Sequence, residues 1–150
     1  MLEIISNYKI IITPIFIGII IVQSIKILIK SNNLKFNLKN YTAYSGMPSG
    51  HSAMVSSLTT MIGLEHGINS TIFAFSFVFT LLVIRDAVGM RQYLGRHGKI
   101  LNTIIEDLKN DKLLDEKYPH LLEKIGHTPM QVFVGVLIGV STSFVIWNFL

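Results

Sequence analysis

The 150-residue sequence contains no cysteine. Neither a disulfide framework nor a thiolate metal site is therefore available, and cysteine usage gives no indication of the redox compartment. Charged residues are also scarce, at 15% of the chain, whereas half of the residues are hydrophobic. With a mean hydropathy of +0.52, the chain is too apolar for an ordinary soluble domain of this size. The composition predicts a protein whose solvent is the lipid bilayer.

The sequence also lacks an internal repeat, a low-complexity tract and a recognisable leader. Residues 1–7 include an acid, Glu3, and the apolar stretch that follows has no small-residue cleavage site, so we expect no cleaved signal. The net charge of +4 would suit nucleic acid, but the basic residues are not interleaved with exposed aromatics. We therefore expect one domain over residues 1–150 and no nucleic-acid partner.

Four stretches of the chain suggest membrane-spanning helices, because about 20 mostly apolar residues cross a bilayer. We place them near residues 8–29, 50–67, 70–90 and 129–149. The second is the weakest because serine and threonine dilute it, although small hydroxyl residues permit close packing inside a bundle. The sequence therefore predicts an all-α integral membrane bundle of about four transmembrane helices.

Basic residues are distributed unevenly between the two ends of these predicted spans. Of the 13 lysines and arginines, only Lys9 falls at one end, and the others belong to residues 30–49, to residues 91–128 or to the adjoining helix ends. Cytoplasmic loops are enriched in basic residues. We therefore expect a multi-pass protein of the cell membrane with both segments in the cytoplasm and both termini outside.

The segment 91–128 has a helical pattern of its own. Apolar residues recur at helical spacing from Ile100 to Leu108 among charged and polar residues, which predicts an amphipathic helix. It could lie on the membrane surface or cover the end of the bundle, and the pattern favours neither. A second short helix is suggested by Leu113, Leu114, Leu121, Leu122 and Ile125.

Polar side chains gather at the cytoplasmic ends of the predicted spans. They are Gln23, Lys26 and Lys30 at the first span, Ser49 and His51 at the second, Arg85, Asp86 and Arg91 at the third, and His127 at the fourth. Cations with histidines suit phosphate chemistry, and ionisable residues at the rim of a membrane bundle are costly unless they function. Residues 46–52 enter a helix, where unpaired amides and glycine let an anion come close. The sequence therefore predicts a phosphate site.

Each of these residues also has a simpler structural explanation. Ser49 could merely cap a helix. A single interfacial histidine such as His51 or His127 is more often structural than catalytic. Lys26 and Arg85 could be interfacial anchors. The combination at one interface favours a site more strongly than any single residue does.

The motifs and their order resemble those of a known family. Residues 46–52 read Gly-Met-Pro-Ser-Gly-His-Ser, which resembles the second signature of the type 2 phosphatidic acid phosphatase superfamily, to which vanadium haloperoxidases also belong. The order of the other motifs resembles its divergent branch of small membrane proteins. These motifs are Gln23–Lys26, Leu64–Gly67, Asp86–Arg91 and Gly126–Val132, so the resemblance covers nearly the whole chain.

The resemblance implies a mechanism that uses no metal or other cofactor. One histidine attacks phosphorus, a second protonates the leaving oxygen, and cations hold the phosphate oxygens. On this resemblance His127 is the nucleophile and His51 is the general acid. An attacking imidazole must be neutral while its partner carries a proton, so the two rings need different environments. The phosphate ligands would be Lys26, Ser49, Gly50 and Arg91, with Arg85 as a further candidate cation.

Two departures from the family's pattern put parts of this assignment in doubt. The usual first signature has a later Arg-Pro, but Asn33 and Leu34 stand at that distance from Lys26, so one phosphate ligand is unassigned. Gln131 replaces the acid that normally orients the nucleophile. It can accept a hydrogen bond from imidazole but cannot stabilise imidazolium by charge, so activity could be low.

A third departure leaves the nucleophile itself open. The third signature is split, and His97 follows Arg91 at the usual distance, which makes it a rival of His127. The proline and glycine pattern after His127 favours His127. Asp86 could orient either histidine, or it could pair with Arg85.

The sequence as a whole predicts a phosphatase acting on a lipid phosphate or diphosphate whose tail stays in the bilayer. The main alternative is a catalytically silent membrane protein that binds an anionic lipid or acts as a scaffold. A transporter or channel subunit is disfavoured because no charge lies in the middle of a span, and a haloperoxidase is disfavoured by the membrane location. Gly135 and Gly139 form a small-residue face that leaves room for a homodimer.

Overall fold

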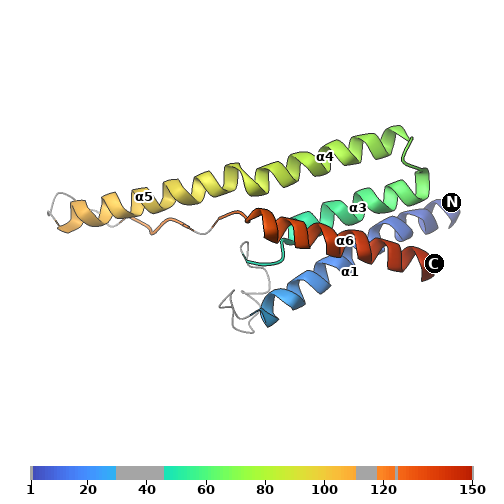
Figure 1. Ribbon diagram of the computed structural model, residues 1–150, viewed down its shortest axis with the longest axis horizontal. Coiled ribbons are helices and arrows are strands. Elements are labelled where there is room, and N and C mark those ends of the chain that lie inside the picture. Colours follow the sequence, from blue (N-terminus) through green and yellow to red (C-terminus); the bar gives the residue numbers. More distant parts are fainter. Residues whose placement is uncertain (1, 30–45, 111–117, 124, 150) are drawn as a thin grey trace.

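The computed structural model describes residues 2–29, 46–110, 118–123 and 125–149. Within this part of the chain every regular element is an α-helix, which confirms the predicted all-α fold. Helices α1, α3, α4 and α6 form a bundle, and α5 extends beyond it in the direction of α4 (Figure 1). The helices are α1 (Leu2–Leu28), α3 (Gly50–His66), α4 (Thr71–Val88), α5 (Met90–Asn110) and α6 (Pro129–Phe149).

Local sequence signals define the ends of these helices. The Ser49 hydroxyl caps α3 by accepting a hydrogen bond from the Ser52 N–H, and the Ser70 hydroxyl caps α4 in the same way. Gly67 ends α3 with a φ of 79°, a conformation that favours glycine. Only four residues separate the two helices, so α3 and α4 pack as an antiparallel hairpin.

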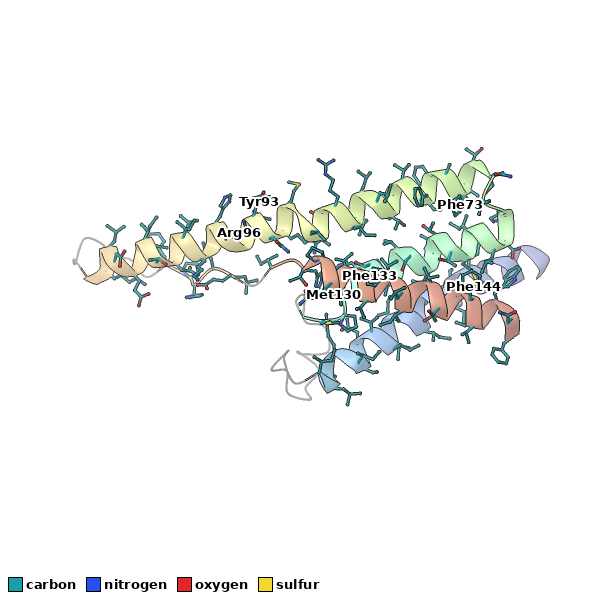
Figure 2. All side chains as sticks on the ribbon, viewed as in Figure 1. Phe73, Tyr93, Arg96, Met130, Phe133 and Phe144 are labelled. Atoms are coloured by element: carbon teal, nitrogen blue, oxygen red, sulfur yellow. The ribbon has the colours of Figure 1, made fainter. Side chains whose placement is uncertain are left out.

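The outer surface of the bundle is apolar, the reverse of a soluble protein. Phe75 of α4 is 75% exposed and Phe16 of α1 is 62% exposed. Phe133 and Phe144 project from α6 in Figure 2 and are also exposed. The stretches long and apolar enough to cross a membrane are Ile11–Leu28, Thr71–Lys109 and Pro129–Phe149. The described part of the chain therefore has three candidate membrane spans.

Helix α3 lies at the centre of the bundle, in contact with α1, α4 and α6. It is not among the three candidate spans, since its 17 residues rise only about 25 Å and many of them carry hydroxyls. Because α3 is enclosed by longer apolar helices, its polarity is hidden from the lipid. The serines and threonines that weakened its sequence signal are the residues through which it packs.

Hydroxyl groups join α3 to its neighbours on two sides. The Ser57 hydroxyl donates to the Gly139 carbonyl oxygen over 3.1 Å, and the Ser143 hydroxyl of α6 donates back to the Ser57 carbonyl oxygen over 3.0 Å. On the side of α4, the Thr80 hydroxyl donates to the Val55 carbonyl oxygen over 3.1 Å and lies 2.8 Å from the Thr59 hydroxyl. These buried hydroxyls thereby make direct hydrogen bonds between the helices.

Glycines on α6 bring its backbone against α3. A Cβ atom on Gly135 would overlap the Ser49 carbonyl oxygen, and one on Gly139 would overlap the Ala53 carbonyl oxygen and the Ser56 hydroxyl. The expectation that this face is open to a second copy is therefore wrong, because α3 of the same chain occupies it.

The ends of the bundle helices gather in two groups, one at each end of the bundle (Figure 1). The start of α1, the end of α6 and the turn between α3 and α4 lie at one end of the bundle (Figure 1). The start of α3, the end of α4 and the start of α6 lie at the other end. This is the grouping that four alternating helices predict, and it gathers the polar helix ends together.

Helix α5 confirms the amphipathic helix expected within the segment 91–128. It continues the direction of α4 away from the bundle, so it does not cover the bundle end (Figure 1). The second short helix is wrong for Leu121 and Leu122, which lie in a non-helical segment. Leu113 and Leu114 fall outside the described residues.

The non-helical segment 118–123 packs along α5. The Asn102 amide donates to the Leu121 carbonyl oxygen and its side-chain oxygen accepts from the Leu121 N–H, at 3.0 and 2.9 Å. A Cβ on Gly95 would overlap the Glu123 carbonyl oxygen, so glycine permits this close approach. The segment is thus guided back along α5 toward the start of α6. Closer to the start of α5, Arg96 lies 5.6 Å from the centre of the Tyr93 ring (Figure 2).

Candidate active site

Two histidines meet at the polar end of the bundle. His51 lies in the first turn of α3, and His127 lies two residues before α6. His51 acts electrostatically on His127, and Lys26 of α1 acts on both rings. Arg91, in the first turn of α5, also acts on His51. The structure therefore brings together four residues that the sequence placed in one site.

His127 is held by three different parts of the chain. Its backbone N–H donates to the Ala87 carbonyl oxygen of α4 over 3.0 Å. Its carbonyl oxygen accepts from the Gln92 amide of α5 over 2.6 Å. Its ring Nδ1 lies 3.3 Å from Gln131 Oε1 of α6, and the residue is only 3% exposed. Both the backbone and the ring are thereby positioned.

The Gln131 contact indicates which ring nitrogen of His127 carries the proton. Gln131 Oε1 also accepts a hydrogen bond from the Thr128 N–H over 3.0 Å. A backbone N–H can only donate, so this side-chain atom is oxygen and not the amide nitrogen. Nδ1 of His127 must then be the donor in the second contact. In the neutral ring this leaves the lone pair on Nε2, as an attacking nitrogen requires.

The surroundings of His127 favour its neutral form. Burial lowers the pKa of this imidazole below its ordinary value of 6.5, and the charges of Lys26 and His51 act in the same direction. Hydrogen bonds to the Gln131 side chain and to the backbone of Gly46 oppose the shift. Because burial is the largest effect, His127 is a neutral base at neutral pH.

The start of α3 presents backbone amides near the two histidines. The Ser49 N–H donates to the Gln131 carbonyl oxygen, and the fully buried Ser49 hydroxyl accepts from the Ser52 N–H, so Ser49 caps the helix. By helix geometry the amides of Gly50 and His51 have no partner inside α3. This end of the helix can therefore approach an anion through its backbone.

Two cations face this end of the bundle. Lys26 is only 2% exposed although it lies in the last turn of a membrane-spanning helix. Arg91 Nε lies 2.6 Å from Asp86 Oδ2, and both side chains are partly exposed. Asp86 thus pairs with Arg91, whereas the sequence had suggested Arg85 or a histidine as its partner. The ion pair holds the guanidinium beside His51 across the junction of α4 and α5.

Other candidate residues lie apart from this site. Arg85 is exposed on α4, one residue before the partly exposed Asp86. His97 is exposed on α5, about 9 Å farther along the helix than Arg91. The structure therefore does not bring Arg85 or His97 to His51 and His127, which removes the geometric basis for His97 as a rival nucleophile. Lys30 and Asn33 lie outside the described residues.

Two glutamines near the site were given no role from the sequence, although Gln23 was among the polar residues expected at this end. Gln92 holds the backbone of His127, as described above. Gln23 Oε1 is buried and has no hydrogen-bond partner within the described part of the chain, and a Cβ on Gly50 would lie 3.8 Å from Gln23 Nε2. The sequence could have indicated both glutamines as site residues, since Gln92 directly follows Arg91 and Gln23 lies one helical turn before Lys26. Among the residues that the structure describes, no group of three or more histidines and acids could hold a metal ion.

Together, the apolar helices and the buried polar end define a multi-pass α-helical membrane protein with a two-histidine site at one end of its bundle. Residues 6–142 match the family described as the Divergent PAP2 family, and the chain belongs to this family. It is 33% identical over 160 residues to "Uncharacterized membrane protein YuiD" of Bacillus subtilis (strain 168), and the alignment covers 99% of each chain. No solved structure matches the chain. The resemblance inferred from the short motifs is thus confirmed.

Proposed function

We propose that this protein is a metal-independent phosphatase that hydrolyses a phosphate or diphosphate ester of a membrane lipid. The observation that carries the proposal is the pair of histidines at one end of the bundle, of which His127 is buried, oriented by Gln131 and favoured in its neutral form. A lipid substrate can leave its tail in the bilayer while its headgroup reaches this end. Membership in the Divergent PAP2 family supports the same class of reaction.

In the proposed reaction, Nε2 of His127 attacks phosphorus and forms a P–N bond as the P–O bond to the lipid breaks. His51 gives a proton to the leaving lipid oxygen from its protonated form, which burial and the charges of Arg91 and Lys26 disfavour by lowering the pKa of this ring. Water then attacks phosphorus, the P–N bond breaks, and His51 takes a proton from this water. Lys26 and Arg91, with the amides of Gly50 and His51, would stabilise charge on the phosphate oxygens.

We further propose that the protein lies in the cell membrane with its site on the cytoplasmic side and both termini outside. The bias of lysine and arginine toward the polar end supports this orientation. Because the chain lacks cysteine, single cysteines introduced at Arg96 and Asn69 can report on sidedness. In intact cells a membrane-impermeant thiol reagent should label the variant at Asn69 and not that at Arg96, and the opposite pattern would reverse the orientation.

The function can be tested with purified protein reconstituted in phospholipid nanodiscs. Release of inorganic phosphate is measured from phosphatidic acid, phosphatidylglycerophosphate and an isoprenoid diphosphate. At least one should be hydrolysed in the presence of a chelator, because the mechanism uses no metal. Binding of all three without phosphate release would instead support a silent lipid-binding protein, which the glutamine at position 131 favours.

The pH dependence of turnover tests the role of His127. Since the neutral ring attacks, kcat/KM should fall as the pH drops through the pKa of His127, which burial holds below 6.5. Gln131→Glu places a negative charge beside the ring, stabilises imidazolium and raises this pKa, so the acid limb should move up by about one pH unit. The two profiles are compared from acid to neutral pH. An identical acid limb in both proteins would contradict the role of Gln131.

A further inference from the structure

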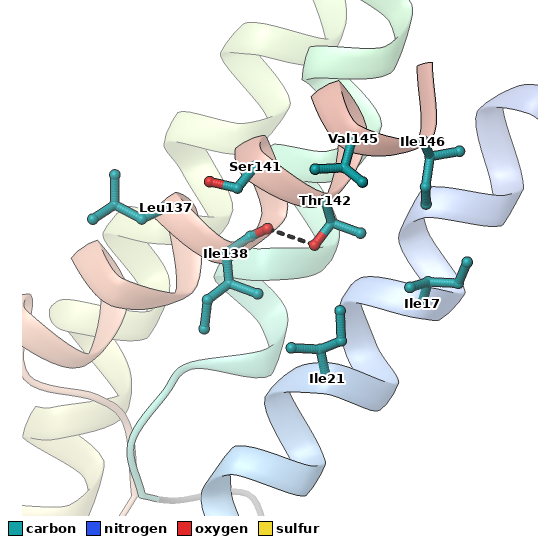
Figure 3. Close-up of a pocket in the computed structure, with 8 residues that line it drawn as sticks. All are labelled: Ile17, Ile21, Leu137, Ile138, Ser141, Thr142, Val145 and Ile146. Atoms are coloured by element: carbon teal, nitrogen blue, oxygen red, sulfur yellow. Dashed lines mark hydrogen bonds between the residues drawn. The ribbon is translucent and has the colours of Figure 1, made fainter. Parts of the chain in front are cut away.

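An apolar groove runs along the outside of the bundle between α1 and α6. Its volume is about 380 Å³, and it is lined by Ile17 and Ile21 of α1 and by residues from Leu137 to Ile146 of α6 (Figure 3). It presents almost no polar surface, because the Thr142 hydroxyl donates to the Ile138 carbonyl oxygen of its own helix over 2.7 Å. The groove is therefore suited to hydrocarbon and not to a headgroup.

The groove lies on the same two helices that carry part of the phosphate site. On α1, Ile21 stands five residues before Lys26, which is about 7.5 Å along the helix axis. On α6, Leu137 stands six residues after Gln131, or about 9 Å. From there the lining continues to Ile146, about another 13 Å toward the far side of the membrane. Along these two helices the polar site is thus followed by the apolar groove, just as the headgroup of a lipid is followed by its hydrocarbon chain.

The shape of the groove favours a slender chain over another helix. Helices that pack in membranes approach through small residues, and the small face of α6 at Gly135 and Gly139 is already occupied by α3. The rim of the groove instead carries large branched side chains, including Leu137 and Val145, which are 49% and 55% exposed. Between them Ser141 and Thr142 are the small side chains of the lining, so the groove is recessed at these two positions. A flexible hydrocarbon chain fits such a recess, whereas a helix does not.

We propose that this groove holds one hydrocarbon chain of the phosphate-bearing lipid while its headgroup lies at His51 and His127. This inference rests on the proposed function for the identity of the headgroup. Lipid chains are as apolar as the groove, so the groove gains little from excluding water. Its contribution is to orient the lipid so that phosphorus lies in line with His127, which is the kind of positioning that accelerates bound reactions.

The test uses full-length protein in nanodiscs and phosphatidic acid that carries a photoreactive diazirine in the middle of one chain. After irradiation, labelled peptides are identified by mass spectrometry. We expect labels on the groove segments 17–21 and 137–146, at several times the level obtained with phosphatidylcholine carrying the same chain. Equal labelling by both lipids, or equal labelling of the outer face of α4, would mean that only bulk lipid fills the groove and would overturn the proposal.

Matched substitutions make the test specific. Ser141→Phe fills the recess from an exposed position and should lower groove labelling by phosphatidic acid about fivefold. Ala74→Phe adds a ring on exposed α4 and should leave labelling unchanged. Unaltered labelling in Ser141→Phe, or crosslinks between two copies through the groove, would contradict the proposal. Phosphate release without groove labelling refutes this inference alone, whereas groove labelling without any phosphate release refutes only the proposed function.

Discussion

Replacing His127 with alanine is expected to abolish phosphate release, with kcat lowered by at least about 10⁴-fold. The loss should be this large because the attacking nitrogen itself disappears and water cannot take its place in the site. Turnover is measured by phosphate release from the best lipid substrate. A second measurement, binding of the same lipid to the variant, should change much less, since Lys26, Arg91 and the start of α3 are untouched.

The matched control for this variant is His97→Ala. His97 is exposed on α5 and lies beyond the site, so its removal should leave kcat within about twofold of the original. Denaturation at alkaline pH after a short incubation with labelled substrate should recover a phosphohistidine peptide that contains His127, since the P–N bond is stable in base and is hydrolysed in acid. Full activity in His127→Ala, or loss of activity in His97→Ala, would reverse the assignment of the nucleophile.

Gly139→Ala is expected to destabilise the protein by about 3 kcal/mol, although alanine is ordinarily the better helix former. In a helix interior this exchange would normally stabilise by about 1 kcal/mol. Here the added methyl group would overlap the Ala53 carbonyl oxygen and the Ser56 hydroxyl, so α3 and α6 must separate. As the two helices separate, the hydrogen bond from the Ser57 hydroxyl to the Gly139 carbonyl oxygen would be lost.

The free energy of unfolding is measured by titration with a denaturing detergent in mixed micelles. Ser141→Ala serves as the control, because it lies two residues along the same helix and faces the groove instead of α3. Its stability should stay within about 0.5 kcal/mol of the original. A Gly139→Ala protein as stable as the control would mean that α3 and α6 do not pack as closely as the structure shows.

Much of the helical arrangement follows from short-range features of the chain. Apolar runs of sufficient length locate α1, α4 and α6, and the predicted spans at 50, 70 and 129 begin within a residue of α3, α4 and α6. The alternation of four helices then puts His51 and His127 at the same end. These features could be predicted because each depends on residues that are neighbours in sequence.

Contacts between helices could not be predicted from short-range features of the sequence. Periodicity shows which residues share one face of a helix, but it does not show which neighbour that face meets. The small face at Gly135 and Gly139 therefore looked suitable for a second copy, while the fold uses it for α3. Likewise, Arg85 and Asp86 are adjacent on α4 and point in different directions. Only the packing of the bundle determines that Asp86, and not the exposed Arg85, lies beside Arg91.

The sequence by itself determined that this chain is an all-α membrane protein, that it carries the motifs of its family, and that its histidines and cations gather at one end. Composition and local spacing are sufficient for these properties, since the bilayer selects apolar helices of a given length. Only the tertiary structure decided that Asp86 pairs with Arg91 and that His97 stands apart. Those outcomes depend on helix rotation and on the direction of α5, which are set by contacts between residues far apart in the chain.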